Sequence, residues 1–226
     1  METNEYWGHH EGFADLIAIV ASLHIDMMVD RLLAHTKGNL FSINELSRVG
    51  ELSQTREIRK AFNDKKMSDV NNEPHDLSEP FVGGAFDVLV EVFQNNLIQR
   101  SLISKELGQR AYQAHFHEVQ DIQREFEQKY RGKEVEFKAA LLDSRDYFGN
   151  LMAKAWSKTS SNNLYYWKIV THMIDADVEL SQGMYGQTIR DCFEWRKINT
   201  LAVDPRLQRA HIVDEMHHTQ DIPSEI

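Results

Sequence analysis

Apolar residues recur at spacings of three and four along most of the chain, whereas the alternating pattern of a half-buried strand is scarce. This periodicity predicts helices at residues 9–22, 25–35, 43–52, 55–62, 81–99, 106–130, 135–156, 164–180 and 185–197. We therefore predict an all-α fold, a multi-helix bundle in which residues 1–200 form a single domain. Pro205 suits the first turn of a short terminal helix, and the rest of residues 201–226 is expected to be a flexible tail.

Two segments depart from the ordinary amphipathic pattern. Residues 81–99 are apolar almost all round, which predicts a central, buried helix. Gly83 and Gly84 near its start would let another element or a ligand approach closely. Residues 63–80 are polar and contain two prolines, so we predict a long loop there, and loops of this length inside a compact domain are often functional.

The composition narrows the class of protein. The chain has 226 residues, of which 42% are hydrophobic, and its formal net charge is −10. This charge argues against a nucleic-acid partner, which would require a basic face. No apolar run approaches the roughly 20 residues of a membrane span, and no signal peptide is recognisable. The single cysteine, Cys192, cannot form an internal disulfide. We expect a cytoplasmic protein with no membrane partner.

Candidate chemistry lies in the first predicted helix, in the stretch HHEGFADLIAIV at residues 9–20. Glu11 and Asp15 are four residues apart, so both carboxylates project from one face of the helix. Two acids at this spacing repel each other unless a cation or a histidine lies between them. Their position near a helix start offers a simpler explanation, because the helix dipole stabilises acids there.

The same stretch resembles the second active-site helix of thermolysin-like zinc metallopeptidases, the gluzincin clan, in the form H-E-x-F-A-D followed by an aliphatic run. The resemblance implies that Glu11 is a zinc ligand and that Asp15 is a carboxylate behind it that orients a zinc-bound histidine. His10, if it faced the site, would hydrogen-bond the substrate or Asp15. A catalytic zinc takes three protein ligands and leaves one position for water.

A second, looser resemblance involves the segment EPH at residues 73–75, which precedes the predicted buried helix. It is similar to the gluzincin segment that carries a transition-state histidine. The resemblance implies that His75 is a catalytic residue that stabilises the oxyanion. The interval of eight residues between His75 and Gly83 is longer than the usual spacing of the family.

The defining H-E-x-x-H motif of the clan is missing. It supplies two zinc histidines and the general base, and the resemblance implies that it precedes Glu11 by about twenty residues or more. Two other stretches begin with His-Glu, at His10 and at His117, but neither has the second histidine. We therefore expect either a C-terminal fragment of a zinc peptidase or a degenerate relative, with little or no activity alone.

The competing hypothesis is a non-catalytic helical interaction protein, in which Glu11 and Asp15 are capping or salt-bridge residues. The peptidase hypothesis implies a peptide substrate and a zinc ion that this chain alone binds weakly or not at all. A chain that lacks part of its domain should also expose apolar surface. A homodimer through such a surface is therefore a further expectation.

Overall fold

The computed structural model describes residues 2–42, 44, 46, 61, 63–114 and 117–199. This part of the chain forms eight α-helices and no strands, which confirms the predicted all-α fold. The helices are α1 (Asn4–Ser22), α2 (Asp26–Thr36), α3 (Pro74–Gln99), α4 (Lys105–Tyr112), α5 (Val119–Tyr130), α6 (Glu134–Lys158), α7 (Tyr166–Ser181) and α8 (Gly186–Trp195).

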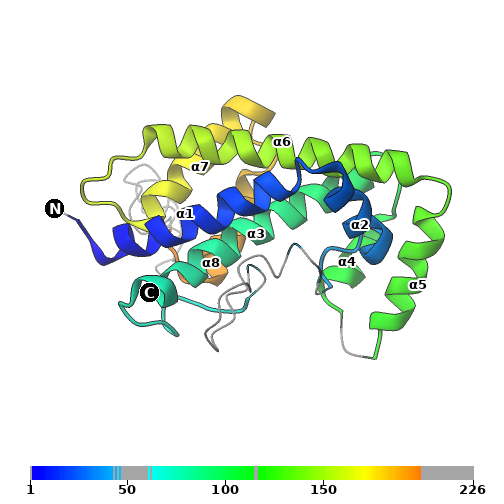
Figure 1. Ribbon diagram of the computed structural model, residues 1–226, viewed down its shortest axis with the longest axis horizontal. Coiled ribbons are helices and arrows are strands. Elements are labelled where there is room, and N and C mark those ends of the chain that lie inside the picture. The colour runs from blue at the N-terminus through cyan, green and yellow to red at the C-terminus, as the bar shows by residue number, and fades with distance from the viewer. Residues whose placement is uncertain are drawn as a thin grey trace, which may run out of the picture.

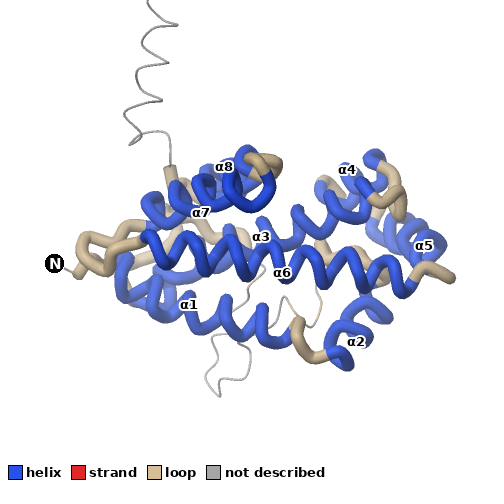
Figure 2. The backbone as a smooth tube through the Cα atoms, turned by 90° about the horizontal axis from the view of Figure 1, so that it is seen from above, coloured by secondary structure: helices blue, strands red, loops and turns tan. Residues whose placement is uncertain are grey.

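Helix α3 is the centre of the bundle. It contacts α1, α4, α6 and α8, and α1 runs beside it along much of its length (Figure 1). Seen from above, α1 lies on one side of α6, whereas α7 and α8 lie on the other (Figure 2). More than half of the residues of α3 are buried, in keeping with the apolar pattern at residues 81–99. The prediction of a central, buried helix is confirmed.

The start of α3 corrects the predicted loop at residues 63–80. The helix begins at Pro74, so residues 74–80 are helical and His75 lies in the first helical turn. Pro74 occupies a position whose N–H has no partner within the helix, and the Glu73 side chain accepts a hydrogen bond from the Asp76 N–H at 2.9 Å. Pro74 fits the first helical turn, whereas Pro80 lies inside the helix and removes one backbone N–H donor from it.

The long helix predicted at residues 106–130 is also wrong, because the chain reverses between α4 and α5. The two helices pack on each other, and Arg110 pairs with Glu125 across them at 2.6 Å. Leu107 and Phe126 are both buried in the same core. Since both helices present an apolar face to one core, the helical periodicity continues in the sequence through the reversal.

Some expectations lie outside the described residues. They include most of the helices predicted at residues 43–52 and 55–62, and the terminal helix and tail at residues 201–226. Within the part that the structure describes, no single helix is long and apolar enough to cross a membrane. Helices α1 and α2 satisfy the length and composition test only when joined, and they are bent by 88°.

Candidate functional site

The N-terminal end of α1 is held by hydrogen bonds to the first residue of α7 and to Leu164, two residues before it. Thr3 caps the helix by accepting a hydrogen bond from the Tyr6 N–H at 3.1 Å, and its hydroxyl donates to the carbonyl of Leu164. The carboxylate of Glu5 accepts a hydrogen bond from the backbone N–H of Tyr166, the first residue of α7. These polar contacts fix the N-terminal end of α1 in addition to the packing of its apolar face.

Two glycines bring α1 close to α3. A Cβ at Gly12 would lie 2.8 Å from Cγ2 of Val82, and a Cβ at Gly8 would collide with the hydroxyl of Tyr166. That hydroxyl in turn donates to the carbonyl of Leu77 at 3.0 Å. Gly8 and Gly12 are each within one turn of Glu11, so the close approach that they permit brings the Glu11 side chain near the first turn of α3.

The structure places Glu11 and His75 in direct contact. Oε2 of Glu11 lies 3.0 Å from Nδ1 of His75, although 64 positions separate the two residues. Both side chains are partly accessible, 34% for Glu11 and 46% for His75. The pair thus lies at the surface of the α1–α3 seam, where a carboxylate and an imidazole share one location.

The other predicted site residues are less closely associated. Asp15 lies one turn beyond Glu11 on α1 and is half-buried, and His10 is exposed. His9 points into the bundle, where its Nε2 accepts a hydrogen bond from Nε1 of Trp156 at 2.9 Å. Burial, aided by the neighbouring His10, lowers the pKa of His9 to about 4, so that it remains neutral.

The side chains of Glu11 and His75 can be compared with the ligands that a zinc site requires. Carboxylate and imidazole are both ordinary zinc ligands, and Glu11 and His75 are close enough to act at one location. Among the described residues, however, no group of three or more histidine, cysteine, aspartate or glutamate side chains is placed to hold a metal ion. A catalytic zinc takes three protein ligands, so at least one donor would have to come from elsewhere.

A second feature is an open cavity of about 1020 Å³ between α3, α4, α5 and α8, which we call the α3–α8 cavity. It reaches α3 at Glu79, one turn beyond His75, while neither Glu11 nor His75 lines it. Five carboxylate side chains line it: Asp64, Glu79, Asp87, Glu91 and Asp191. In the described part of the lining, the basic residues are Lys65 and Arg196, and the aromatic residues are Phe41, Tyr112 and Trp195.

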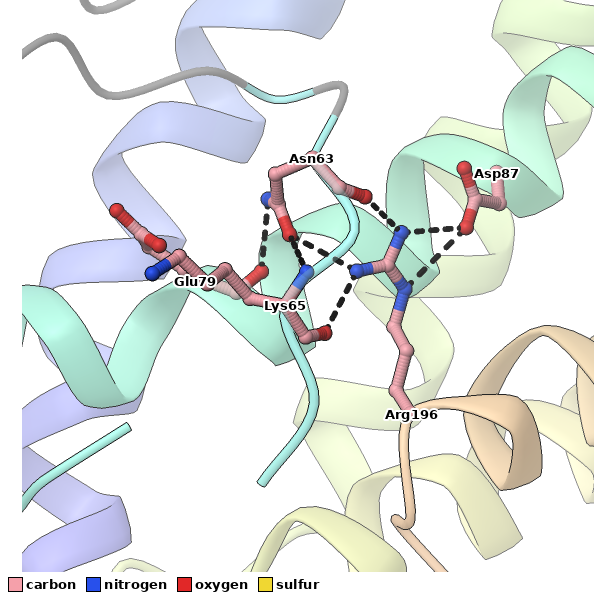
Figure 3. A network of polar contacts seen from close by, with 5 residues as sticks. All are labelled: Asn63, Lys65, Glu79, Asp87 and Arg196. Carbon is pink, nitrogen blue, oxygen red and sulfur yellow. Dashed lines mark hydrogen bonds and ion pairs between the residues drawn. The ribbon is translucent and has the colours of Figure 1, made fainter. Parts of the chain in front are cut away.

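Arg196 ties three segments of the chain together at one wall of this cavity (Figure 3). Its guanidinium, 1% exposed, donates to Oδ2 of Asp87 at 2.7 and 3.2 Å. It also donates to the side-chain and backbone oxygens of Asn63, at 2.9 and 2.7 Å, and to the carbonyl of Lys65 at 3.0 Å. All five N–H donors of the guanidinium are thus hydrogen-bonded to oxygen atoms of the protein.

The close approach expected at Gly83 and Gly84 is explained by α8. A Cβ at Gly83 would lie 2.6 Å from Cζ of Arg196, and one at Gly84 would lie 2.7 Å from the ring of Phe193. Side chains of α8, rather than a ligand, therefore occupy the space that these glycines leave.

The acids of α3 have altered protonation behaviour. Burial raises the pKa of Asp87, against the opposing effect of Arg196. Burial, and then the charge of Asp87, raise the pKa of Glu91 to about 7. Burial also raises the pKa of the Cys192 thiol, and the nearby carboxylates add to this shift. The thiol is consequently protonated at neutral pH, as expected for a structural cysteine rather than a nucleophile.

The sequence reasoning missed Asp87, Glu91 and Arg196, although one signal was available. Asp87 and Glu91 are two acids four residues apart in an otherwise apolar helix, the same spacing as that of Glu11 and Asp15. Arg196 gave no such signal, because its burial depends on how α8 packs on α3.

With the fold and the site in view, the class that the structure itself defines is an all-α multi-helix bundle. A comparison of the chain with protein-family models, with curated proteins and with solved structures finds no match.

Proposed function

We propose that this chain carries the glutamate and histidine portion of a zinc-dependent peptidase site, with the remaining ligands and the general base supplied by other polypeptide. The contact between Glu11 and His75 is the observation that carries the proposal. This contact joins two segments that resemble gluzincin motifs and are far apart in the sequence.

In this proposal each residue has a distinct role. Glu11 donates a carboxylate oxygen to the metal, and Asp15, on the same face of α1, supports the ligand geometry. His75 lies in the first turn of α3 and stabilises developing negative charge on the substrate carbonyl. A zinc ion held by Glu11 and by donors from other polypeptide would supply Lewis-acid chemistry at that carbonyl and at a water molecule. The described residues supply fewer donors than a catalytic zinc takes, so the chain alone should be inactive.

Zinc titration of the purified chain by calorimetry tests the proposal. We expect weak binding that is lost in Glu11→Gln and retained in His75→Ala, because His75 is assigned to the substrate carbonyl rather than to the metal. The matched controls Glu136→Gln and His24→Ala alter exposed residues elsewhere and should bind zinc as the wild type does. Equal binding by all five proteins would contradict the proposal. Zinc-dependent peptide cleavage by the chain alone, abolished by Glu11→Gln, would refute the assigned inactivity but not the site.

The genomic sequence offers an independent test of where the missing residues come from. An in-frame H-E-x-x-H about twenty to sixty codons upstream of the Glu11 codon would supply the two histidines and the general base. A reading frame without such a motif favours a degenerate relative.

A second candidate function, a helical interaction protein, has an observation of its own. Trp7, Phe13 and Ile17 on α1 are 49%, 40% and 45% exposed, and Met27 at the start of α2 is 75% exposed. Under this alternative the contact between Glu11 and His75 only joins α1 to the first turn of α3. The zinc titration separates the two functions, because an interaction protein has no requirement for a metal at this pair.

A further inference from the structure

We propose that the α3–α8 cavity binds an organic cation, a ligand that carries ammonium or guanidinium groups. The proposal rests on the charge balance of the lining, on unmatched hydrogen-bond acceptors and on the aromatic wall. It does not depend on the function of the Glu11–His75 pair, because neither residue lines the cavity. The volume of about 1020 Å³ is at the upper end of the range for small-molecule sites.

The charge of the lining favours a cation. Among the described residues that line the cavity, five are carboxylates and two are basic, Lys65 and Arg196. The guanidinium of Arg196 is directed entirely to protein acceptors, so it has no donor left for an anionic ligand. It neutralises Asp87 but not the acid one turn further along α3, Glu91. A ligand with positive charge would restore the balance.

Two acceptors in the lining have no hydrogen-bond donor among the residues that the structure describes. Glu91 is partly buried and makes no hydrogen bond or ion pair with the described residues. Asn39 is 5% exposed; its amide nitrogen donates to Gln123 at 3.2 Å, while its Oδ1 accepts no hydrogen bond from the described part of the chain. Buried acceptors are normally satisfied, and an N–H-rich ligand is the kind that would satisfy them.

The aromatic side of the cavity suits the same chemistry. Phe41 and Tyr112 pack edge to face with their centroids 5.7 Å apart, and Trp195 is half-exposed at the rim. Nζ of Lys66 lies 4.4 Å from the centroid of the Trp195 ring. Cζ of Arg196 lies 5.2 Å from the same centroid, so Trp195 already attracts two cations of the protein. Phe41 and Tyr112 are then the aromatic rings of the lining that a ligand cation would contact.

Calorimetric titration with two cationic probes tests the inference. Spermidine represents a free polyamine, and an acetylated, amidated tri-arginine peptide represents basic side chains. Octane-1,8-diol and the corresponding tri-alanine peptide are the neutral counterparts. Saturable binding of either cation, without binding of its neutral counterpart, supports the inference, and the probe that binds more tightly identifies the source. No saturable binding of either cation, or equal binding of the neutral probes, would overturn it.

Variants locate the binding. Glu91→Gln should raise the Kd about tenfold, the loss expected for one charge-assisted hydrogen bond. Asp191→Asn, at an exposed position of the lining, should raise it about threefold. Glu136→Gln removes the same charge from the exposed face of α6 and should leave the Kd unchanged. If Glu136→Gln weakens binding as much as Glu91→Gln does, attraction to the overall negative charge explains the affinity and the cavity site is refuted. Circular dichroism confirms that each variant is folded.

Discussion

Replacement of Arg196 by methionine should destabilise the protein strongly. The substitution keeps most of the apolar side-chain volume but removes five hydrogen bonds and the charge that faces Asp87. Removal of one partner of a buried ion pair costs about 3–5 kcal/mol, because the other charge stays behind unpaired. The Asp87 side chain retains 27% exposure, so we expect the lower end of this range, about 3 kcal/mol.

This loss is measurable by thermal or urea unfolding followed by helical circular dichroism. For a domain of this size each kcal/mol lowers Tm by about 2–4 °C, so Tm should fall by about 6–12 °C. Arg196→Lys should lose much of the same stability, because one ammonium cannot reach the oxygens that the guanidinium fork bridges. The matched control is Arg124→Met. Arg124 pairs with Asp121 on α5 and is 71% exposed, so its loss should be below about 0.5 kcal/mol.

A double variant tests the reason for the loss. If the unpaired Asp87 carboxylate is responsible, Asp87→Leu combined with Arg196→Met should recover a large part of the stability lost in Arg196→Met alone. A loss of less than about 1 kcal/mol in Arg196→Met would refute the reasoning. No recovery in the double variant would show that the bonds to Asn63 and Lys65, rather than the ion pair, stabilise this wall of the cavity.

Three further predictions follow from the structure. Gly12→Ala should destabilise the protein by about 1–3 kcal/mol, because the new methyl group meets a side chain of α3 at 2.8 Å. Gly149→Ala meets only an ordinary contact at 3.6 Å and should stabilise it by up to about 1 kcal/mol; urea unfolding that ranks the two alike would contradict this. Glu91→Gln should raise Tm at pH 8 and leave it unchanged at pH 4. Burial, and then the charge of Asp87, raise the pKa of Glu91 from 4.5 to about 7. Proton binding by Glu91 therefore stabilises the folded wild type fully below pH 4.5, and this contribution disappears as the pH rises through 7. A Tm difference between the two proteins that is independent of pH would contradict this cause. Ile17→Ser should reduce any self-association seen by analytical ultracentrifugation, because this side chain is 45% exposed on the apolar face of α1; a dimer that the substitution leaves unchanged would place the interface elsewhere.

The helical periodicity was sufficient for the class of fold and for most of the helices. Its two failures have physical causes. At residues 63–80 the prolines suggested a loop, but Pro74 fits the first turn of a helix, where the N–H groups need no partner inside the helix. Pro80 lies inside α3 at the loss of one backbone donor. At residues 106–130 the apolar period continues across a reversal, because α4 and α5 face the same core.

The candidate site, too, could be predicted only in part from the sequence. The sequence indicated the residue types and pointed to Glu11, Asp15 and His75, since the spacing of acids in a helix and the resemblance to peptidase motifs are properties of the chain itself. It contained no measure of the distance between Glu11 and His75. That distance depends on how closely α1 packs on α3. Gly8 and Gly12 permit the close packing because they face Leu77 and Val82 of α3.

By itself, the sequence of this protein determined where most helices form, which faces are apolar, and that α3 is buried, because these properties depend on local spacing. The tertiary structure alone decided that Glu11 meets His75, that Arg196 is buried against Asp87, and that five carboxylates share one cavity. These features join segments far apart in the chain. Their energies come from desolvation and from the pairing of charges, which exist only once the helices have packed.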